Sequence, residues 1–267
     1  MKREQLIQQV SDQEVWDVVV IGGGASGLGA AVDAAARGYR TLLLEQVDFA
    51  KATSSRSTKL VHGGVRYLQQ GNISLVREAL HERGLMYENA PHLVTNLAFI
   101  VPRYKWWEGP FYGIGLKLYD LLAGKLNLAK SRQLNHADTM AAIPNLEEEG
   151  LDGGTEYHDG QFDDSRMCAT LVRTAFDHDA TMLNHATVIG LLRDESEHIS
   201  GVRFRDEETG DEHEAKARVV INAAGVFSNA IRRMDEAEAE SVVEPSRGVH
   251  LVLDASFLMG DTAIMVP

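Results

Sequence analysis

The feature that most constrains this chain is a short apolar run that leads directly into closely spaced glycines. Residues 17–21 read Asp-Val-Val-Val-Ile, a β-branched run typical of a buried parallel strand. Gly22, Gly24 and Gly27 follow at once, and the alanine-rich stretch 25–37 predicts a helix. A strand, a glycine loop and a helix in this order predict a βαβ unit that binds a dinucleotide.

Each glycine of this loop has its own physical task. Gly22 permits the tight turn, Gly24 lets a pyrophosphate approach the backbone, and Gly27 lets the helix pack on the strand. The helix N-terminus offers amide hydrogens and a partial positive charge to the phosphates. Glu45 ends the second predicted strand, 41–44, where a carboxylate can accept both ribose hydroxyls and disfavours a 2′-phosphate. These residues alone fit FAD and NAD equally well.

Composition and charge exclude other classes of protein. The 267 residues carry a formal net charge of −13, which does not suit a general nucleic-acid binder, since phosphate backbones need a basic surface. Cys168 is the single cysteine, which excludes an intramolecular disulfide, and the ten histidines show no metal-ligand spacing, so we predict no metal. The N-terminus lacks the apolar core of a signal peptide, and we expect a cytoplasmic protein.

Three further segments decide between the cofactors. Residues 52–68 read Ala-Thr-Ser-Ser-Arg-Ser-Thr-Lys-Leu-Val-His-Gly-Gly-Val-Arg-Tyr-Leu. Residues 157–166 read Tyr-His-Asp-Gly-Gln-Phe-Asp-Asp-Ser-Arg, and residues 219–225 read Val-Val-Ile-Asn-Ala-Ala-Gly. Together with the glycine loop, these segments closely resemble the FAD-dependent, respiratory glycerol-3-phosphate dehydrogenases, which belong to the glycine/D-amino-acid-oxidase-like flavoproteins. The resemblance extends from about Trp16 to the end of the chain and favours FAD.

The resemblance implies a reaction and a fold. The reaction is oxidation of sn-glycerol 3-phosphate to dihydroxyacetone phosphate by hydride transfer from C2 to flavin N5, with electrons passing to a membrane quinone or, in some relatives, to oxygen. The fold is α/β, with a Rossmann-like FAD-binding domain interrupted by an α+β substrate-facing domain.

We expect four segments of chain in this fold. They are the first part of the FAD-binding domain at 1–100, an inserted substrate-facing or membrane-proximal segment at 101–160, a return to the FAD-binding domain at 161–230, and the start of a substrate domain at 231–267. Helices are predicted over 75–88, 111–122 and 163–176, and strands over 186–192, 199–205 and 217–222.

The segment 52–68 also carries the residues that the resemblance assigns to catalysis. His62 can take the proton of the C2 hydroxyl, since an imidazole exchanges protons near neutral pH. Arg66 can grip a phosphate oxygen with its planar set of donors, and Tyr67 can add a hydroxyl contact. Taken singly, they also fit a loop histidine, a surface charge and a helix-packing aromatic. Asp159, Asp163 and Arg166 are interpreted as mainly structural residues that hold the cap of the 163–176 helix.

Contacts to FAD are expected from the glycine loop, the end of the second strand, the 52–68 segment and two later strands. The residues are Gly22, Gly23, Gly24, Ala25, Ser26, Gly27, Glu45, Gln46, Ser54, Ser55, Lys59, Leu60, Gly63, Gly64, Val188, Ala223, Ala224 and Gly225.

Residues 103–132 differ from the rest of the acidic chain. They hold six Lys or Arg and two acids, interleaved with the aromatic residues Trp106, Trp107, Phe111, Tyr112 and Tyr119. Such a stretch can seat a protein on an anionic membrane, where a quinone resides, and the face expected here is the inner face of the cytoplasmic membrane. It equally fits a buried helix whose long basic side chains reach outward to solvent.

Members of the family are longer chains, and residues 263–267 read as a strand that lacks its partner. We therefore expect this length of chain alone to bind FAD weakly and to turn over little substrate. Two alternatives remain open. One is another oxidoreductase of the same superfamily, such as one acting on 2-hydroxyglutarate or sarcosine. The other is a non-catalytic flavin-binding fragment or a split subunit.

Overall fold

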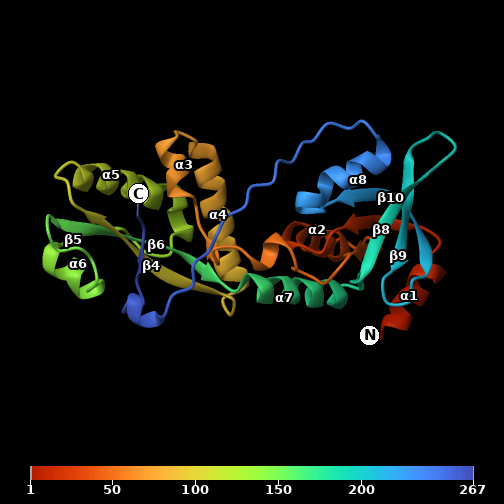
Figure 1. The fold of residues 1–267 in the computed structure, drawn as a ribbon, viewed down its shortest axis with the longest axis horizontal. Coiled ribbons are helices and arrows are strands. Elements are labelled where there is room, and N and C mark those ends of the chain that lie inside the picture. The colour runs from red at the N-terminus through yellow and green to blue at the C-terminus, as the bar shows by residue number, and fades with distance from the viewer. Residues whose placement is uncertain (1, 267) are drawn as a thin grey trace. The chain divides into compact units, whose positions relative to one another are not determined.

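A computed structural model describes residues 2–266, except for the side chains of Arg66 and Gln69. The chain divides into two compact units, each with its own sheet (Figure 1). Unit 1 runs to Ser57 and resumes over Asp164–Gly248, whereas unit 2 comprises Thr58–Asp163 and the stretch from Val249 onward. The two mixed units confirm the α/β fold class, and the expected segment boundaries stay a prediction.

Unit 1 is built on a six-stranded sheet in the order β7-β2-β1-β10-β9-β8. The strands are β1 (Trp16–Ile21), β2 (Thr41–Leu44), β7 (Thr181–Leu183), β8 (Ala186–Arg193), β9 (Ile199–Asp206) and β10 (Glu212–Asn222). β1 is parallel to β2 and to β10, and Ile21 lies opposite both Leu44 and Asn222. The carboxyl ends of three strands therefore meet at one edge of the sheet.

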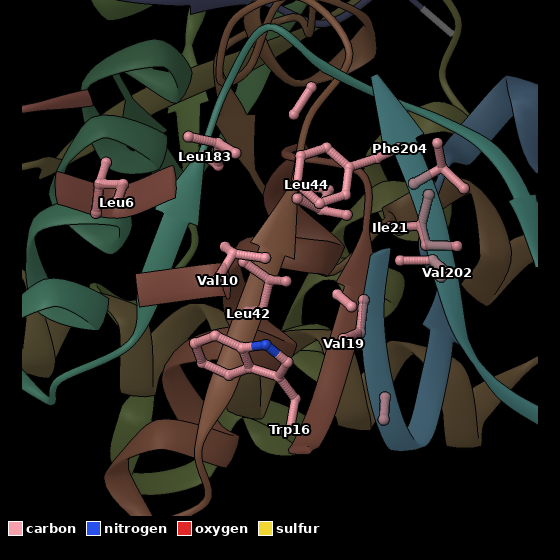
Figure 2. Close-up of a cluster of buried hydrophobic side chains, with 14 residues drawn as sticks. Leu6, Val10, Trp16, Val19, Ile21, Leu42, Leu44, Leu183, Val202 and Phe204 are labelled. Atoms are coloured by element: carbon pink, nitrogen blue, oxygen red, sulfur yellow. The ribbon is translucent and has the colours of Figure 1, made fainter. Parts of the chain in front are cut away.

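Helices bury both faces of these parallel strands, which explains their continuous apolar sequence. On one face, α1 (Arg3–Asp12) contributes Leu6 and Val10. On the other face, α2 (Ala25–Ala36) packs with α7 (Asp164–Asp177). Figure 2 shows the first cluster, to which the strands contribute Trp16, Val19, Ile21, Leu42, Leu44, Leu183, Val202 and Phe204. The predicted helices at 25–37 and 163–176 and the predicted strands of this unit are confirmed to within a few residues, apart from an earlier start of β10.

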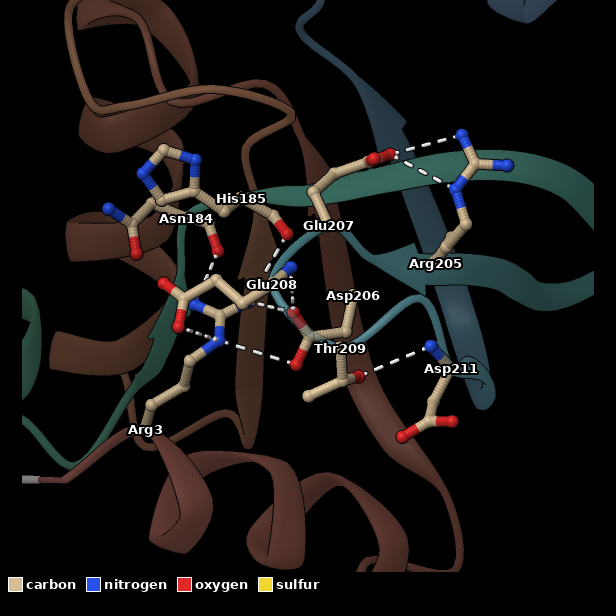
Figure 3. Close-up of polar contacts among 9 residues, drawn as sticks. All are labelled: Arg3, Asn184, His185, Arg205, Asp206, Glu207, Glu208, Thr209 and Asp211. Carbon is tan, nitrogen blue, oxygen red and sulfur yellow. Dashed lines mark hydrogen bonds and ion pairs between the residues drawn. The ribbon is translucent and has the colours of Figure 1, made fainter.

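Arg3 ties α1 to two distant connections of unit 1 (Figure 3). Its guanidinium donates to the carbonyl oxygens of Asn184 (2.8 Å) and His185 (3.1 Å), and to the carboxylate of Asp206 (2.7 Å). The Asp206 side chain is 3% exposed. Burial raises the pKa of the Asp206 carboxyl, but the hydrogen bonds from Arg3 and the Glu208 amide, together with the charge of Arg3, hold this pKa below its ordinary value.

Unit 2 contains a sheet in the order β11-β4-β6-β3, and β5 also pairs with β6. The strands are β3 (Leu60–Val61), β4 (Val94–Arg103), β5 (Arg132–Asn135), β6 (Gly153–Phe162) and β11 (Ala263–Ile264). The helices are α3 (Val65–Gln69), α4 (Ile73–Asn89), α5 (Glu108–Ala123) and α6 (His136–Ala142). The predicted helices at 75–88 and 111–122 are confirmed as α4 and α5.

The core of unit 2 lies between its sheet and the helices α4 and α5. Val76 and Leu80 of α4 and Leu116 of α5 are at most 1% exposed and pack beside Phe99 of β4. Figure 1 shows α4 and α5 next to the strands β4 and β6. Within residues 2–266, none of the helices combines the length and the apolar composition that a bilayer crossing requires.

The Arg3 contacts predict a pH-dependent contribution to stability. Arg3→Met leaves the buried Asp206 carboxylate without its partner, so we expect the free energy of unfolding at pH 7 to fall by about 2 kcal/mol. The pKa of Asp206 is lower in the folded protein than in the unfolded chain. The stability that this carboxylate contributes is therefore fully present above its unfolded-state pKa, near 4, and is lost as the pH falls through its folded-state pKa. Urea unfolding at several pH values should therefore show that the free energies of unfolding of Arg3→Met and of the unmodified chain converge at acid pH.

Arg37→Met is the matched control for this measurement, since Arg37 pairs with Asp33 on the exposed face of α2, with both side chains about two-thirds exposed. We expect it to change stability little at any pH. A constant difference between Arg3→Met and the unmodified chain from neutral to acid pH would contradict the assigned role of Asp206.

Candidate functional site

The glycine loop fits tightly between the ends of β1 and β10 and the start of α2. Gly22 has φ +111°, in the region that favours glycine, and its amide donates to the Leu44 carbonyl (2.8 Å). A side chain at Gly27 would collide with the Gly22 carbonyl, and one at Gly22 would collide with the Ala223 backbone. Two positions of the predicted motif therefore exclude side chains because backbone meets backbone there.

Gly24 lies on the open side of the same loop. It is the residue before the first turn of α2, with extended backbone and no side-chain cap. A Cβ at this position would approach only the Ser54 hydroxyl, at 3.1 Å. That hydroxyl accepts the Ala25 amide hydrogen at 2.8 Å. The helix N-terminus thus faces an opening, where its amides and partial positive charge suit a phosphate.

Glu45 stands at the end of β2, beside the loop. Its carboxylate accepts the amide hydrogens of Gly23 (2.7 Å) and Val47 (2.9 Å), one at each oxygen. Each carboxylate oxygen has two acceptor positions, so both oxygens can still accept a hydroxyl. The interaction with Gly23 also fixes the carboxylate against the loop. Gln46 follows with an exposed side chain.

A hollow of about 280 Å³ opens in unit 1 over the ends of these strands. It brings together predicted residues from five parts of the chain. They are Gly22, Gly24, Glu45, Gln46, Ser54, Val188, Ala223, Ala224 and Gly225. A hollow that combines a glycine opening, a helix N-terminus and a carboxylate has the groups that bind a dinucleotide.

Other predicted residues of unit 1 lie outside this hollow. Gly23 and Gly27 are buried behind it, and Ala25 and Ser26 form the first turn of α2. Ser55 lies in the short 3₁₀ helix after Ala52 and lines a second hollow, of about 360 Å³.

Sequence reasoning missed several residues that line the main hollow. Lys51 and Thr53 come from the same loop as Ser54, and Phe227, Ile231 and Met234 come from α8 (Ser228–Asp235) and the turn before it. Lys51 stands next to the 52–68 segment and Thr53 lies within it, so their positions in the sequence were signals for both.

Unit 2 contains a separate hollow of about 510 Å³. Leu60, His62, Gly64 and Tyr67 line it, as do Phe99, Tyr157, Asp159 and Met265. His62 is exposed, and Tyr67 is 45% exposed. The side chain of Arg66 lies outside the described residues. Lys59 precedes β3 with φ +61°, and its carbonyl accepts the Phe162 amide hydrogen.

A buried polar network lies under the loop that follows His62. The Gly63 amide donates to the Tyr119 hydroxyl (2.7 Å), which donates to the Asp159 carboxylate (2.9 Å). Arg83 of α4 donates to the same carboxylate (2.7 Å) and to the His158 carbonyl (3.1 Å). Arg83, Tyr119 and Asp159 are at most 2% exposed. The interpretation of Asp159 as a support for the helix cap is wrong, since its carboxylate pairs with Arg83 from the middle of β6.

Burial affects the titration of this network. It raises the pKa of the Tyr119 hydroxyl, and the neighbouring Asp159 carboxylate raises it further. Burial also raises the pKa of Asp159, although Arg83 opposes this effect. Tyr119 is therefore a neutral donor throughout the physiological range. Among the described residues, no group of three or more His, Cys, Asp or Glu side chains gathers where it could hold a metal ion.

The fold and the hollow of unit 1 define a dinucleotide-binding protein of the Rossmann-like type. A family model described as FAD dependent oxidoreductase matches residues 17–265. The chain belongs to this family of FAD-dependent oxidoreductases, and FAD is its cofactor, as the resemblance predicted.

Individual relatives agree with this assignment. The chain is 43% identical to the mitochondrial glycerol-3-phosphate dehydrogenase of Schizosaccharomyces pombe, over 99% of this chain and 43% of that protein. It is 41% identical to the mitochondrial glycerol-3-phosphate dehydrogenase of Bos taurus, over 99% of this chain and 38% of that protein. The chain thus spans less than half the length of these curated relatives.

Solved structures show the same fold. The glycerol-3-phosphate dehydrogenase of Bacillus halodurans complexed with FAD superposes with a TM-score of 0.68 at 33% identity, covering 88% of this chain and 39% of that one. The L-proline dehydrogenase of P. horikoshii superposes with a TM-score of 0.65 at 19% identity, covering 85% of this chain and 57% of that one, which shows the likeness of fold alone.

Proposed function

We propose that this chain carries the FAD-binding and proton-accepting residues of an enzyme that oxidises sn-glycerol 3-phosphate to dihydroxyacetone phosphate. The observation that carries the proposal is that His62 and Tyr67 line one hollow. They do so in a chain that is 43% identical to a glycerol-3-phosphate dehydrogenase over 99% of this chain's length. In this proposal unit 1 holds the cofactor, and the hollow of unit 2 receives the substrate.

The cofactor contacts of unit 1 follow from the geometry of its hollow. Gly24 and the N-terminus of α2 would receive the pyrophosphate, and the Glu45 carboxylate would accept the ribose hydroxyls. Ala223 and Gly225 would line the nucleotide from the end of β10. Among the residues of the 52–68 segment, Ser54 would donate to the pyrophosphate region.

The chain's own task in the reaction concerns the proton and the orientation of the substrate. When bound, FAD supplies the hydride acceptor. His62 takes the proton of the C2 hydroxyl as the C2 hydrogen leaves with its electron pair, so that C2 becomes a carbonyl carbon. Arg66 would hold the phosphate group, and Tyr67 would hydrogen-bond a substrate oxygen. The paired glycines Gly63 and Gly64 would permit a close approach to the flavin ring.

The test is anaerobic reduction of bound FAD by glycerol 3-phosphate, followed by visible absorption. With excess FAD we expect slow but substrate-dependent bleaching of the flavin band in the unmodified chain. His62→Gln should lower the reduction rate about a hundredfold or more, since it removes the proton acceptor. His81→Gln is the matched control, because His81 is exposed on α4, and it should reduce at the unmodified rate. Bleaching in His62→Gln at the unmodified rate would contradict the proposal.

We further propose that the electrons pass to a quinone and that α5 seats the protein on the membrane, at the inner face of the cytoplasmic membrane. One face of α5 is buried, but the other exposes an apolar row at 36–75%. This row consists of Phe111, Ile114, Leu118 and Leu121. Trp106, 86% exposed, precedes it, and Lys105 and Lys117 flank it. An apolar row with flanking lysines suits the interface of an anionic bilayer.

Reversing the two flanking charges tests the membrane contact. Lys105→Glu with Lys117→Glu should weaken binding to vesicles of phosphatidylcholine and phosphatidylglycerol by about tenfold or more, since each lysine near the surface contributes about 1 kcal/mol. The control pair, Arg173→Glu with Lys216→Glu, makes the same charge change on exposed positions of unit 1 and should bind like the unmodified chain. Equal binding of all three proteins in a flotation assay would remove the membrane role of α5.

A further inference from the structure

The loop at Gly63 and Gly64 has little steric restraint of its own. Gly64 adopts a left-handed conformation, with φ +68°. Gly63 leaves no room for a side chain, because a Cβ there would lie 2.6 Å from the Tyr119 hydroxyl. Two successive glycines allow a wide range of backbone conformations in the unfolded and partly open states. The direction in which His62 projects must therefore be fixed by contacts from outside the loop.

The hydrogen bonds under the loop supply such contacts, and their direction is determined. Tyr119 accepts the Gly63 amide hydrogen, so its own proton must point to Asp159. Arg83 balances the charge of that carboxylate through an ion pair at 2.7 Å. The chain of donors thus runs from the Gly63 amide through Tyr119 to Asp159, and each bond polarises the next.

Packing alone does not account for this arrangement. The network lies in an apolar cluster with Val76, Leu80 and Phe99, where a phenylalanine at position 119 would fill the same volume without a polar group. Two nitrogens of Arg83, Nε and Nη2, are buried and have no hydrogen-bond partner among the described residues. A buried ion pair with unsatisfied donors is commonly less favourable than apolar packing. The presence of this polar group in an apolar cluster therefore points to the Gly63 amide, which it contacts through Tyr119.

We propose that Tyr119, Asp159 and Arg83 are positioning residues that fix the backbone at Gly63 and thereby the direction in which His62 enters the hollow of unit 2. This inference rests on the proposed function of His62 as the proton acceptor. The three residues come from α5, β6 and α4, so the loop is held from three elements of the same unit.

The first test measures hydrogen exchange of the Gly63 amide and needs no substrate. Tyr119→Phe removes one hydroxyl, and amide hydrogen exchange at Gly63 should become about tenfold faster. Tyr112→Phe is the matched control: Tyr112 is a buried tyrosine of the same helix and the same apolar cluster. It should leave exchange at Gly63 unchanged. Unchanged exchange in Tyr119→Phe, or an equal increase in both variants, would overturn the proposal.

The second test separates positioning from a purely structural role. In the flavin-reduction assay, Tyr119→Phe should lower the reduction rate constant by about tenfold to a hundredfold, because a small misplacement of the proton acceptor is costly. The apparent Kd for glycerol 3-phosphate should stay within about twofold, since no substrate contact is removed. An unchanged rate constant, or a loss confined to substrate affinity, would overturn the proposal.

A second variant covers the case in which Tyr119→Phe does not fold. Arg83→Lys keeps the buried charge but not the guanidinium nitrogen, Nη1, that reaches both the Asp159 carboxylate and the His158 carbonyl. It should change the exchange at Gly63 and the reduction rate in the same direction. If the unmodified chain itself reduces no flavin, the proposed function fails. The exchange measurement at Gly63 then decides the positioning role by itself.

Discussion

The contact on which unit 1 depends is the meeting of two backbone segments at Gly22 and Gly27. Because neither residue has a side chain, α2 can start directly against the end of β1, with the β10 end at Ala223 on the other side. Any Cβ at Gly27 would push the helix away from the sheet. This close packing places the helix N-terminus at the edge where the parallel strands end, which is the edge where ligands bind in open α/β sheets.

Much of this arrangement could be predicted from sequence because its signals are local. The apolar run of β1, the glycine spacing and the carboxylate at Glu45 lie within about thirty residues and specify one βαβ unit. The prediction that Val188 and Ala223 contact the same cofactor came from the family resemblance, because the order of strands in a sheet cannot be predicted from local sequence. The helix α1 went unpredicted, although Leu6 and Val10 stand four residues apart and both are buried.

The network in unit 2 shows where sequence reasoning ends. Arg83, Tyr119 and Asp159 are far apart in the chain, and each has an ordinary interpretation when taken singly. Tyr119 fits an apolar helix, Arg83 fits a surface charge, and Asp159 fits a cap residue. Only the packing of α4, α5 and β6 against one another shows that they share one buried cluster under Gly63. Long-range polar pairing has no periodicity, so pattern reasoning does not detect it.

The central claim is that the opening at Gly24 binds the pyrophosphate of FAD. It is tested most directly by measuring the FAD affinity of the Gly24→Val variant, with flavin fluorescence as the signal. Gly24 has extended backbone that valine adopts readily, and only the Ser54 hydroxyl, 3.1 Å from its Cβ position, has to shift, so the variant should stay folded with a modest loss of unfolding temperature. We expect its FAD affinity to fall by about tenfold or more, whereas Gly29→Ala, with open space at its Cβ, should bind as the unmodified chain does. Equal FAD affinity in Gly24→Val and the unmodified chain would contradict the account.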